Sequence, residues 1–302
     1  MVKNIKRYMK ILQKEDPELS EFVPATFNLP NEYAIFVQEF LRNSNAMWIM
    51  KPTARSQGKG IFLINKLSQV KKWRLAGPSL SSSSSLLAQP ANKESYIVSR
   101  YLDNPFLVGG KKFDLRIYVL VTNFRPLRVY QHCHGFARFC NVKYTSESCD
   151  MDNEFMHLTN VAIQKHNEDY NLSHGGKWHI RNLRLFIGST RGQEASSELF
   201  SSIDSSIIHS LNSVQGIMLN DKHCFECYGY DILIDADLKP WLVEINASPS
   251  LSVTTESDRI IKTELLRDIY NIMVPPNSAS SSGVHASLST ESLSAGVTSD
   301  RF

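Results

Sequence analysis

The chain has 302 residues, of which 42% are apolar and 21% charged, so it is long enough to bury a sizeable core in about two domains. This composition excludes a small disulfide-stapled peptide and a mostly disordered chain. The net charge of +3 is too small for a protein that lives on nucleic acid. The sequence has no run of 18 apolar residues and no apolar stretch at its N-terminus, so we expect no membrane span, no secretory signal and reduced, cytosolic cysteines.

Residues 1–16 predict an amphipathic basic helix, because apolar residues recur at helical spacing and basic residues occupy the positions between them. Such a helix either packs on the protein by its apolar stripe or faces an acidic polymer, and the pattern leaves both open. The apolar residues are Val2, Ile5, Met9 and Leu12, and the basic ones are Lys3, Lys6, Arg7, Lys10 and Lys14.

Residues 47–274 alternate short apolar strands with helical stretches at 198–214 and 258–273, which predicts an α+β or α/β enzyme fold. Two segments lack the apolar residues that a core requires. The serine-rich stretch at 79–90 is expected to be a loop, and residues 276–302 are expected to be a disordered tail.

A glycine-bearing loop follows the strand WIMKP at 48–52, with the sequence SQGKG at 56–60. Backbone amides of such a loop can approach phosphate oxygens because glycine has no Cβ, and Lys51 can add a positive charge. A P-loop would need Gly-Lys followed by Ser or Thr and a helix, whereas an apolar strand follows here. Alone, the pattern is equally typical of a plain β-hairpin with a surface lysine.

The segment KKFDLRIYVLV at 111–121 reads as a strand with charged residues on one face. Alternation places Lys112, Asp114 and Arg116 on that face and Phe113 on the other. An exposed strand face would give the same pattern. The apolar residues that follow favour a central strand that lines a cleft.

Residues 229–250 predict a hairpin whose second strand carries Glu244 and Asn246 on one face. If the hairpin pairs Asp231 with Asn246, then Asp231 joins them. Two carboxylates and an amide oxygen form a ligand set suited to Mg²⁺. A shift of one residue would break this set, and the alternative is that these acids only solubilise the strand. The apolar residues that flank them argue against that alternative.

The chain resembles the tubulin tyrosine ligase-like amino-acid ligases, which have the ATP-grasp fold, and among them the polyglutamylases of cilia and basal bodies. The resemblance runs from residue 1 to about 275. It rests on WIMKP (48–52), SQGKGIFL (56–63), GGKKFDLRIYVLV (109–121), HLTNVAIQK (157–165), HGGKW (174–178), and the blocks DKHCFECYGYDILID and LKPWLVEINASPSL that end at Leu251.

The resemblance implies a role for each matched position. In the reaction that we expect, the cations Lys51, Lys112 and Arg116 would offset charge in phosphoryl transfer, with Lys112 and Arg116 as the catalytic residues. The ATP contacts would be Lys51, Gln57, Gly58, Ser99, Arg100, Tyr101, Leu102, Lys112, Phe113, Asp114, Thr159 and Asn160. The Mg²⁺ ligands would be Asp231, Glu244 and Asn246, and the amino-acid substrate would be held by Arg138, Lys177 and Lys262.

The expected function is ATP-dependent addition of free L-glutamate to glutamate side chains of tubulin tails through an acyl phosphate, with Mg²⁺ and no covalent enzyme intermediate. The expected partners are tubulin or microtubules and accessory subunits, but no nucleic acid or membrane. The expected location is the cytoplasm and cytoskeleton, at the basal body of a cilium or flagellum. Two alternatives are a non-catalytic module that binds microtubules or a partner subunit, and a ligase for a small-molecule acid.

The expected domains are a helical remnant at 1–46, a central ATP-grasp subdomain at 47–102 and a C-terminal subdomain at 103–275, with nucleotide in the cleft between the last two. Relatives usually carry another domain ahead of MVKNIKRY, so we expect this chain to lack it.

Cys224 and Cys227 have the spacing of half a zinc site. With no second Cys-x-x-Cys pair, a zinc site is not expected.

Overall fold

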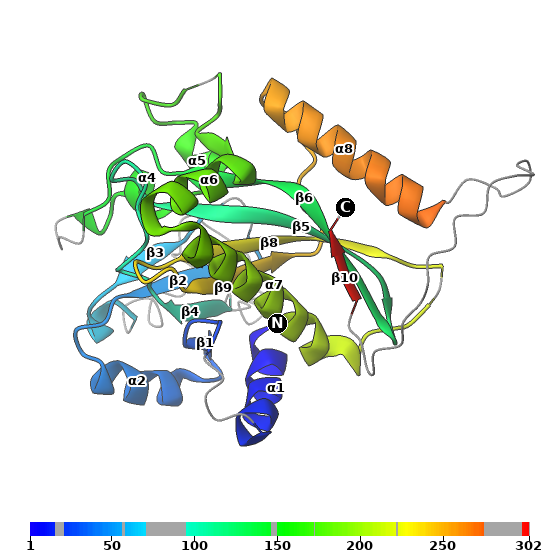
Figure 1. Ribbon diagram of the computed structural model, residues 1–302. Helices are drawn as coiled ribbons and strands as arrows, with labels where there is room; N and C mark the ends of the chain where they lie inside the picture. Colours follow the sequence, from blue (N-terminus) through cyan, green and yellow to red (C-terminus); the bar gives the residue numbers. More distant parts are fainter. Residues whose placement is uncertain are drawn as a thin grey trace, which may run out of the picture.

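The computed structural model describes residues 1–15, 21–55, 58–70, 95–145, 150–171, 173–221, 223–274 and the backbone of 298–301. These residues form two sheets with helices packed around them (Figure 1). The pairings within both sheets are antiparallel except for the last strand, so the α+β expectation is confirmed. Gln57, the 79–90 loop and residues 276–297 lie outside the described residues.

The smaller sheet holds one aromatic core. Trp48 is fully buried in it, with the rings of Phe27, Phe36 and Phe40 at centroid distances of 5.9, 5.2 and 6.5 Å. Strand alternation sends Trp48 and Met50 into this core and leaves Lys51 on the opposite side. The sheet has the order β1-β4-β2-β3, with β1 (Thr26–Leu29), β2 (Trp48–Pro52), β3 (Phe62–Ile64) and β4 (Tyr96–Arg100), and α2 (Tyr33–Arg42) packs on it.

The larger sheet has six strands, and β5 lies at its centre. Residues Phe113, Leu115 and Ile117 of β5 face the main core, as the alternation predicted. The sheet has the order β10-β6-β5-β8-β9, and β7 pairs with β6. Its strands are β5 (Phe113–Phe124), β6 (Leu127–Phe139), β7 (Lys177–His179), β8 (Glu226–Ile234), β9 (Pro240–Asn246) and β10 (Thr298–Arg301).

Helices cover the two faces of the larger sheet unequally (Figure 1). α6 (Ile180–Arg191) and α7 (Gln193–Gln215) pack over the main core, and α1 (Val2–Glu15) lies against α7. α8 (Glu256–Met273) packs on part of the other face through Ile261, Leu265 and Ile269, against Tyr118, Leu120 and Phe136. The rest of that face is polar and carries the site. The short helices α4 (Glu154–His157) and α5 (Val161–Gln164) lie beside it.

The first helix packs on the protein by its apolar stripe. Ile5 and Met9 are 4% and 7% exposed and belong to the main core. Lys6 contributes to this packing, because its ammonium group donates a hydrogen bond to the carbonyl of Thr26 at 2.5 Å and lies 4.7 Å from the ring centroid of Phe27. The helix therefore links the two sheets, and its basic residues, Lys6 included, remain exposed.

The tail expectation was wrong for residues 298–301. Their backbone forms β10, which pairs in parallel with residues 128–131 of β6. An edge strand offers unpaired backbone groups that any extended segment can satisfy, and composition does not reveal such a pairing.

No helix in the described part of the chain is long and apolar enough to span a membrane. The domain boundaries remain predictions.

Phe36→Ala should lower the free energy of unfolding by about 3–5 kcal/mol, because it removes a fully buried ring and leaves a cavity. Leu41→Ala on the same helix is the matched control, since Leu41 is 67% exposed, and it should change stability by less than about 0.5 kcal/mol. Urea unfolding followed by tryptophan fluorescence measures both. Equal losses would contradict the aromatic core.

Candidate functional site

Two carboxylates and two guanidinium groups form a buried network on the polar face of the larger sheet. Arg138 binds Asp114 with both prongs of its fork, at 2.8 and 2.5 Å, and also contacts Asp231 at 3.0 Å. Arg116 binds Asp231 at 2.6 and 3.1 Å. All four side chains are no more than 14% exposed.

The strand register explains this network. Arg116 lies directly opposite Asp231 on β8, and Asp114 lies opposite Arg138 on β6. Residues opposite each other in an antiparallel pair share a face, so each acid meets a base. Burial alone would raise the pKa of Asp231, but Arg138 and Arg116 outweigh it and hold that pKa below its ordinary value. The carboxylate therefore stays charged.

The hairpin of β8 and β9 brings the three predicted metal ligands together, although in a different register. Asp231 pairs with Glu244, and Asn246 pairs with Gly229. The expected pairing of Asp231 with Asn246 was therefore wrong. The register shifts between Asp231 and Ile232, and such an irregularity cannot be inferred from alternation. All three side chains still share one face, with the amide nitrogen of Asn246 3.4 Å from Asp231 Oδ2.

The residues of this hairpin fit a hard divalent cation such as Mg²⁺. Their oxygen donors are two carboxylates and an amide, the types that such ions prefer. Glu244 remains accessible to solvent, yet loss of hydration and then repulsion from Asp231 raise the pKa of its carboxyl group. A cation between these groups would relieve that repulsion. Among the described residues, no group of three or more His, Cys, Asp or Glu could hold a metal. The candidate set has two carboxylates, and its third oxygen is that of the Asn246 amide.

Lys51 faces this hairpin from the smaller sheet. Burial lowers the pKa of its ammonium group, whereas Glu244 and Asp231 act in the opposite direction. The site is therefore assembled from both sheets, with a cation on β2 and the acids on β8 and β9.

Lys112 ends a chain of polar contacts that fixes a histidine tautomer. The carbonyl of Asp150 can only accept, so His157 Nε2 donates to it at 2.9 Å. Burial lowers the pKa of His157, so its ring is neutral and Nδ1 accepts from the Tyr101 hydroxyl at 2.8 Å. That oxygen in turn accepts from Lys112 Nζ at 2.9 Å. Lys112 is 2% exposed and is held in place by this chain.

The loop residues matched to ATP contacts lie beside this chain. Thr159 donates its hydroxyl to Asp114 Oδ2 at 2.7 Å. Gly58 has φ +80°, and a Cβ there would lie 2.5 Å from Ile163 Cδ1 and 3.2 Å from the Asn160 side-chain oxygen. The positive φ, rather than this contact, favours glycine at this position, because Ile163 Cδ1 is the end of a flexible side chain that could move.

The remaining expected ATP contacts differ in their burial and in the direction of their side chains. The backbone of Tyr101 donates to Met47, and the Ser99 hydroxyl accepts from Thr26 at 3.0 Å. Arg100 is exposed and Leu102 is half-buried. Phe113 points into the main core, away from the polar face. A pocket nearby is lined by Ile61, Phe62, Leu63, Met151, Asp152, Glu154, His157 and Leu158.

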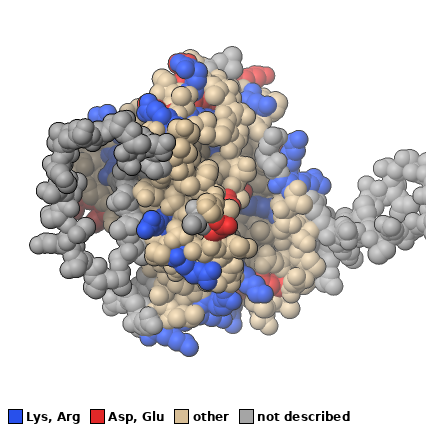
Figure 2. Space-filling view, turned by 90° about the vertical axis from the view of Figure 1, so that its right-hand side faces the viewer, with Lys and Arg blue, Asp and Glu red and all other residues tan. Residues whose placement is uncertain are grey.

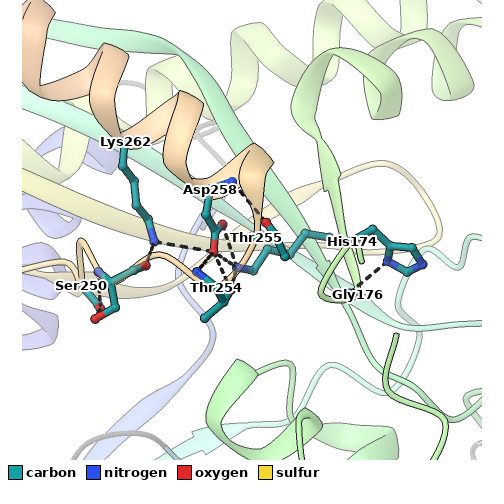
Figure 3. A network of polar contacts seen from close by, with 9 residues as sticks. His174, Gly176, Ser250, Thr254, Thr255, Asp258 and Lys262 are labelled. Atoms are coloured by element: carbon teal, nitrogen blue, oxygen red, sulfur yellow. Dashed lines mark hydrogen bonds and ion pairs between the residues drawn. The ribbon is translucent and has the colours of Figure 1, made fainter. Parts of the chain in front are cut away.

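The two lysines matched to the amino-acid site meet at Asp258. Figure 3 shows the side chain of Lys262 beside that carboxylate. Lys177 contacts both carboxylate oxygens at 2.8 Å, and Lys262 lies 3.9 Å from one of them. Lys177 is also the cross-strand neighbour of Arg138, so the three expected substrate contacts lie in one region. Arg138, however, already has its fork on Asp114.

Sequence reasoning missed Asp258 and the chain through His157. Asp258 precedes Lys262 by one helical turn, a spacing that brings opposite charges together, so this signal was present in the sequence. The contact between Tyr101 and His157 joins residues 56 positions apart, and nothing in the local pattern predicts it.

Cys224 is exposed and Cys227 half-buried, and both are free thiols.

A model of the tubulin-tyrosine ligase family matches residues 1–282. The chain is 52% identical to "Probable alpha-tubulin polyglutamylase Ttll1" of Tetrahymena thermophila, over 96% of this chain and 73% of that protein. It is 46% identical to "Probable tubulin polyglutamylase TTLL9" of Bos taurus, over 90% of this chain and 64% of that protein. It is 34% identical to "Tubulin polyglutamylase TTLL5" of Homo sapiens, over 83% of this chain and 19% of that protein. The chain belongs to the tubulin-tyrosine ligase family.

Proposed function

We propose that this protein is an ATP-dependent ligase that adds glutamate to glutamate side chains in the acidic tails of tubulin. The observation that carries the proposal is the set of Asp231, Glu244 and Asn246 on one face of the larger sheet. Lys51 of the smaller sheet is close enough for Glu244 and Asp231 to act on its pKa. The names of the relatives support tubulin as the protein substrate. The nucleotide would lie between the two sheets, as in an ATP-grasp enzyme.

The proposed reaction has two steps. The acceptor carboxylate attacks the γ-phosphate of ATP, which gives an acyl phosphate and releases ADP. The amine of free glutamate then attacks the acyl carbon, an amide bond forms, and phosphate leaves with the carbon–oxygen bond electrons while the amine loses a proton. When bound, Mg²⁺ would neutralise phosphate charge.

The residues of the chain supply position and charge. Lys51 and Lys112 would approach the phosphates from the smaller sheet and from the start of β5, where hydrogen bonding to Tyr101 holds Lys112. Arg116 would add positive charge beside Asp231. Such fixed cations favour the charge that develops in phosphoryl transfer. Burial lowers the pKa of Lys112, so its charge depends on the anions around it.

An accessible basic surface supports a partner with an acidic tail. Lys3, Arg7 and Lys10 on α1 are exposed. On the face shown in Figure 2, Lys and Arg side chains are spread from the top to the lower edge, and several of them lie in the lower half. A location in the cytoskeleton, at the base of a cilium or flagellum, belongs to the same proposal.

Glu244→Gln should abolish ATP-dependent incorporation of labelled glutamate into microtubules and leave the melting temperature nearly unchanged, because it removes a metal ligand that is accessible to solvent. Glu226→Gln is the matched control, since Glu226 lies on the same hairpin, opposite Val121 and far from the site. Chelation of divalent cations should stop the reaction, and added Mg²⁺ should restore it. Activity of Glu244→Gln within about tenfold of wild type would remove Glu244 from the metal site.

Thermal stability tests the alternative of a non-catalytic binding module. Mg·ATP at 100 times its dissociation constant should stabilise the folded chain by about 2.7 kcal/mol and raise its melting temperature. A melting temperature that does not move, together with intact microtubule association, would favour the binding module.

Replacing Lys3 and Lys10 with Glu should weaken co-sedimentation with microtubules at low salt. The loss should match the one that high salt causes in the wild type, because exposed charges are screened over about 8 Å at physiological ionic strength. Lys6 is left intact because it contacts Thr26. Reversing the exposed Arg42 and Lys66 is the control. If co-sedimentation changes neither with salt nor with either pair of substitutions, microtubules are recognised by another part of the protein.

A further inference from the structure

A single buried carboxylate holds the two lysines of the expected amino-acid site. Asp258 has no exposed surface, and its oxygens accept from Lys177 at 2.8 Å and from the backbone and hydroxyl of Thr254 at 3.1 and 2.6 Å. Lys262 donates to the carbonyl of Ser252 and lies 3.9 Å from Asp258. Figure 3 shows Lys262 and Thr254 directed toward Asp258 from the helix and from the preceding loop.

Two separate parts of the chain build this arrangement. Gly175 and Gly176, both with positive φ, make the turn that leads Lys177 into β7. Asp258 and Lys262 lie one turn apart on α8, and Thr255 caps that helix by accepting from the Asp258 amide at 3.2 Å. Asp258 joins Lys177 of β7 to α8 through a charge, and Lys262 of the same helix lies within 3.9 Å of the same carboxylate.

The charges leave this cluster positive. Burial alone would raise the pKa of Asp258, but hydrogen bonds from Lys177 and Thr254 and the nearby lysine charges hold it below its ordinary value, so the group is a carboxylate. One carboxylate cannot neutralise two ammonium groups. Burial lowers the pKa of Lys262, and the positive charges of Lys177 and Arg116 act in the same direction, whereas Asp258 opposes them. An added carboxylate would therefore be attracted to this place.

We propose that Asp258 is a positioning residue that sets the spacing of Lys177 and Lys262 so that the pair receives a carboxylate of the incoming amino acid. This inference rests on the proposed ligase function for the identity of that amino acid. Asp258 touches no reacting atom in this proposal, and it acts through the two lysines.

The first test compares Michaelis constants. Asp258→Asn should raise the KM for glutamate by about tenfold or more and leave the KM for ATP within about twofold, because it loosens the lysines without touching the expected nucleotide site. Glu256→Gln is the matched control, since it removes an exposed acid from the same helical turn, where the acid pairs only with Arg259 among the described residues. That variant should leave both constants unchanged.

The second test reads the lysines directly, without catalysis. In the wild type, acetylation by an N-hydroxysuccinimide ester, followed by peptide mass spectrometry, should be several-fold slower at Lys177 and Lys262 than at the exposed Lys66. Asp258→Asn should abolish this protection, and Glu256→Gln should not. If Asp258→Asn does not fold, Thr254→Val serves instead, with Thr254→Ser as its control, because the serine keeps the hydroxyl that donates to Asp258.

The outcomes separate the two proposals. Unchanged protection in Asp258→Asn would overturn the anchoring role, and parallel changes in both KM values would reduce Asp258 to a structural residue. A wild-type chain that does not incorporate glutamate overturns the proposed function and the glutamate part of this inference. The acetylation pattern would then still decide whether Asp258 holds the lysines.

Discussion

The contact of two arginines with Asp231 is the constraint on which the site depends. A buried carboxylate is costly without a partner, and Arg116 and Arg138 together make its charge tolerable. The strand register decides which acid meets which base, so the same hydrogen bonds that build the sheet also build the site. Arg138 extends the network to Asp114, and Thr159 brings in the loop ahead of α5.

The two sheets contribute different kinds of groups. The larger sheet supplies paired charges whose positions follow from register, whereas the smaller sheet supplies Lys51 from a strand whose other face is an aromatic core. Lys112 connects the two sheets, because it precedes β5 of the larger sheet and donates a hydrogen bond to Tyr101, which follows β4 of the smaller sheet. The positions of the charged groups between the two sheets therefore depend on the cores that pack against the opposite faces of those sheets.

Much of this site followed from alternation along single strands. The polar face of β5 and the hairpin carrying Glu244 and Asn246 were predicted because apolar residues flank them, and α8 was predicted from its periodicity. The partners of these residues were harder to predict. Pairing Asp231 with Glu244 depends on a register shift, and the fork of Arg138 closes on a residue 24 positions away. Local sequence carries no record of such contacts.

The arginine network has a consequence for natural sequence variation. Because Asp114, Arg116, Arg138 and Asp231 share their charges, replacing any one of them leaves a buried ion without its partner, and the effects of two replacements will not add. A lineage can therefore leave this arrangement only by changing acid and base together, or by passing through a damaged intermediate. Among relatives, the residues at these four positions should therefore change together.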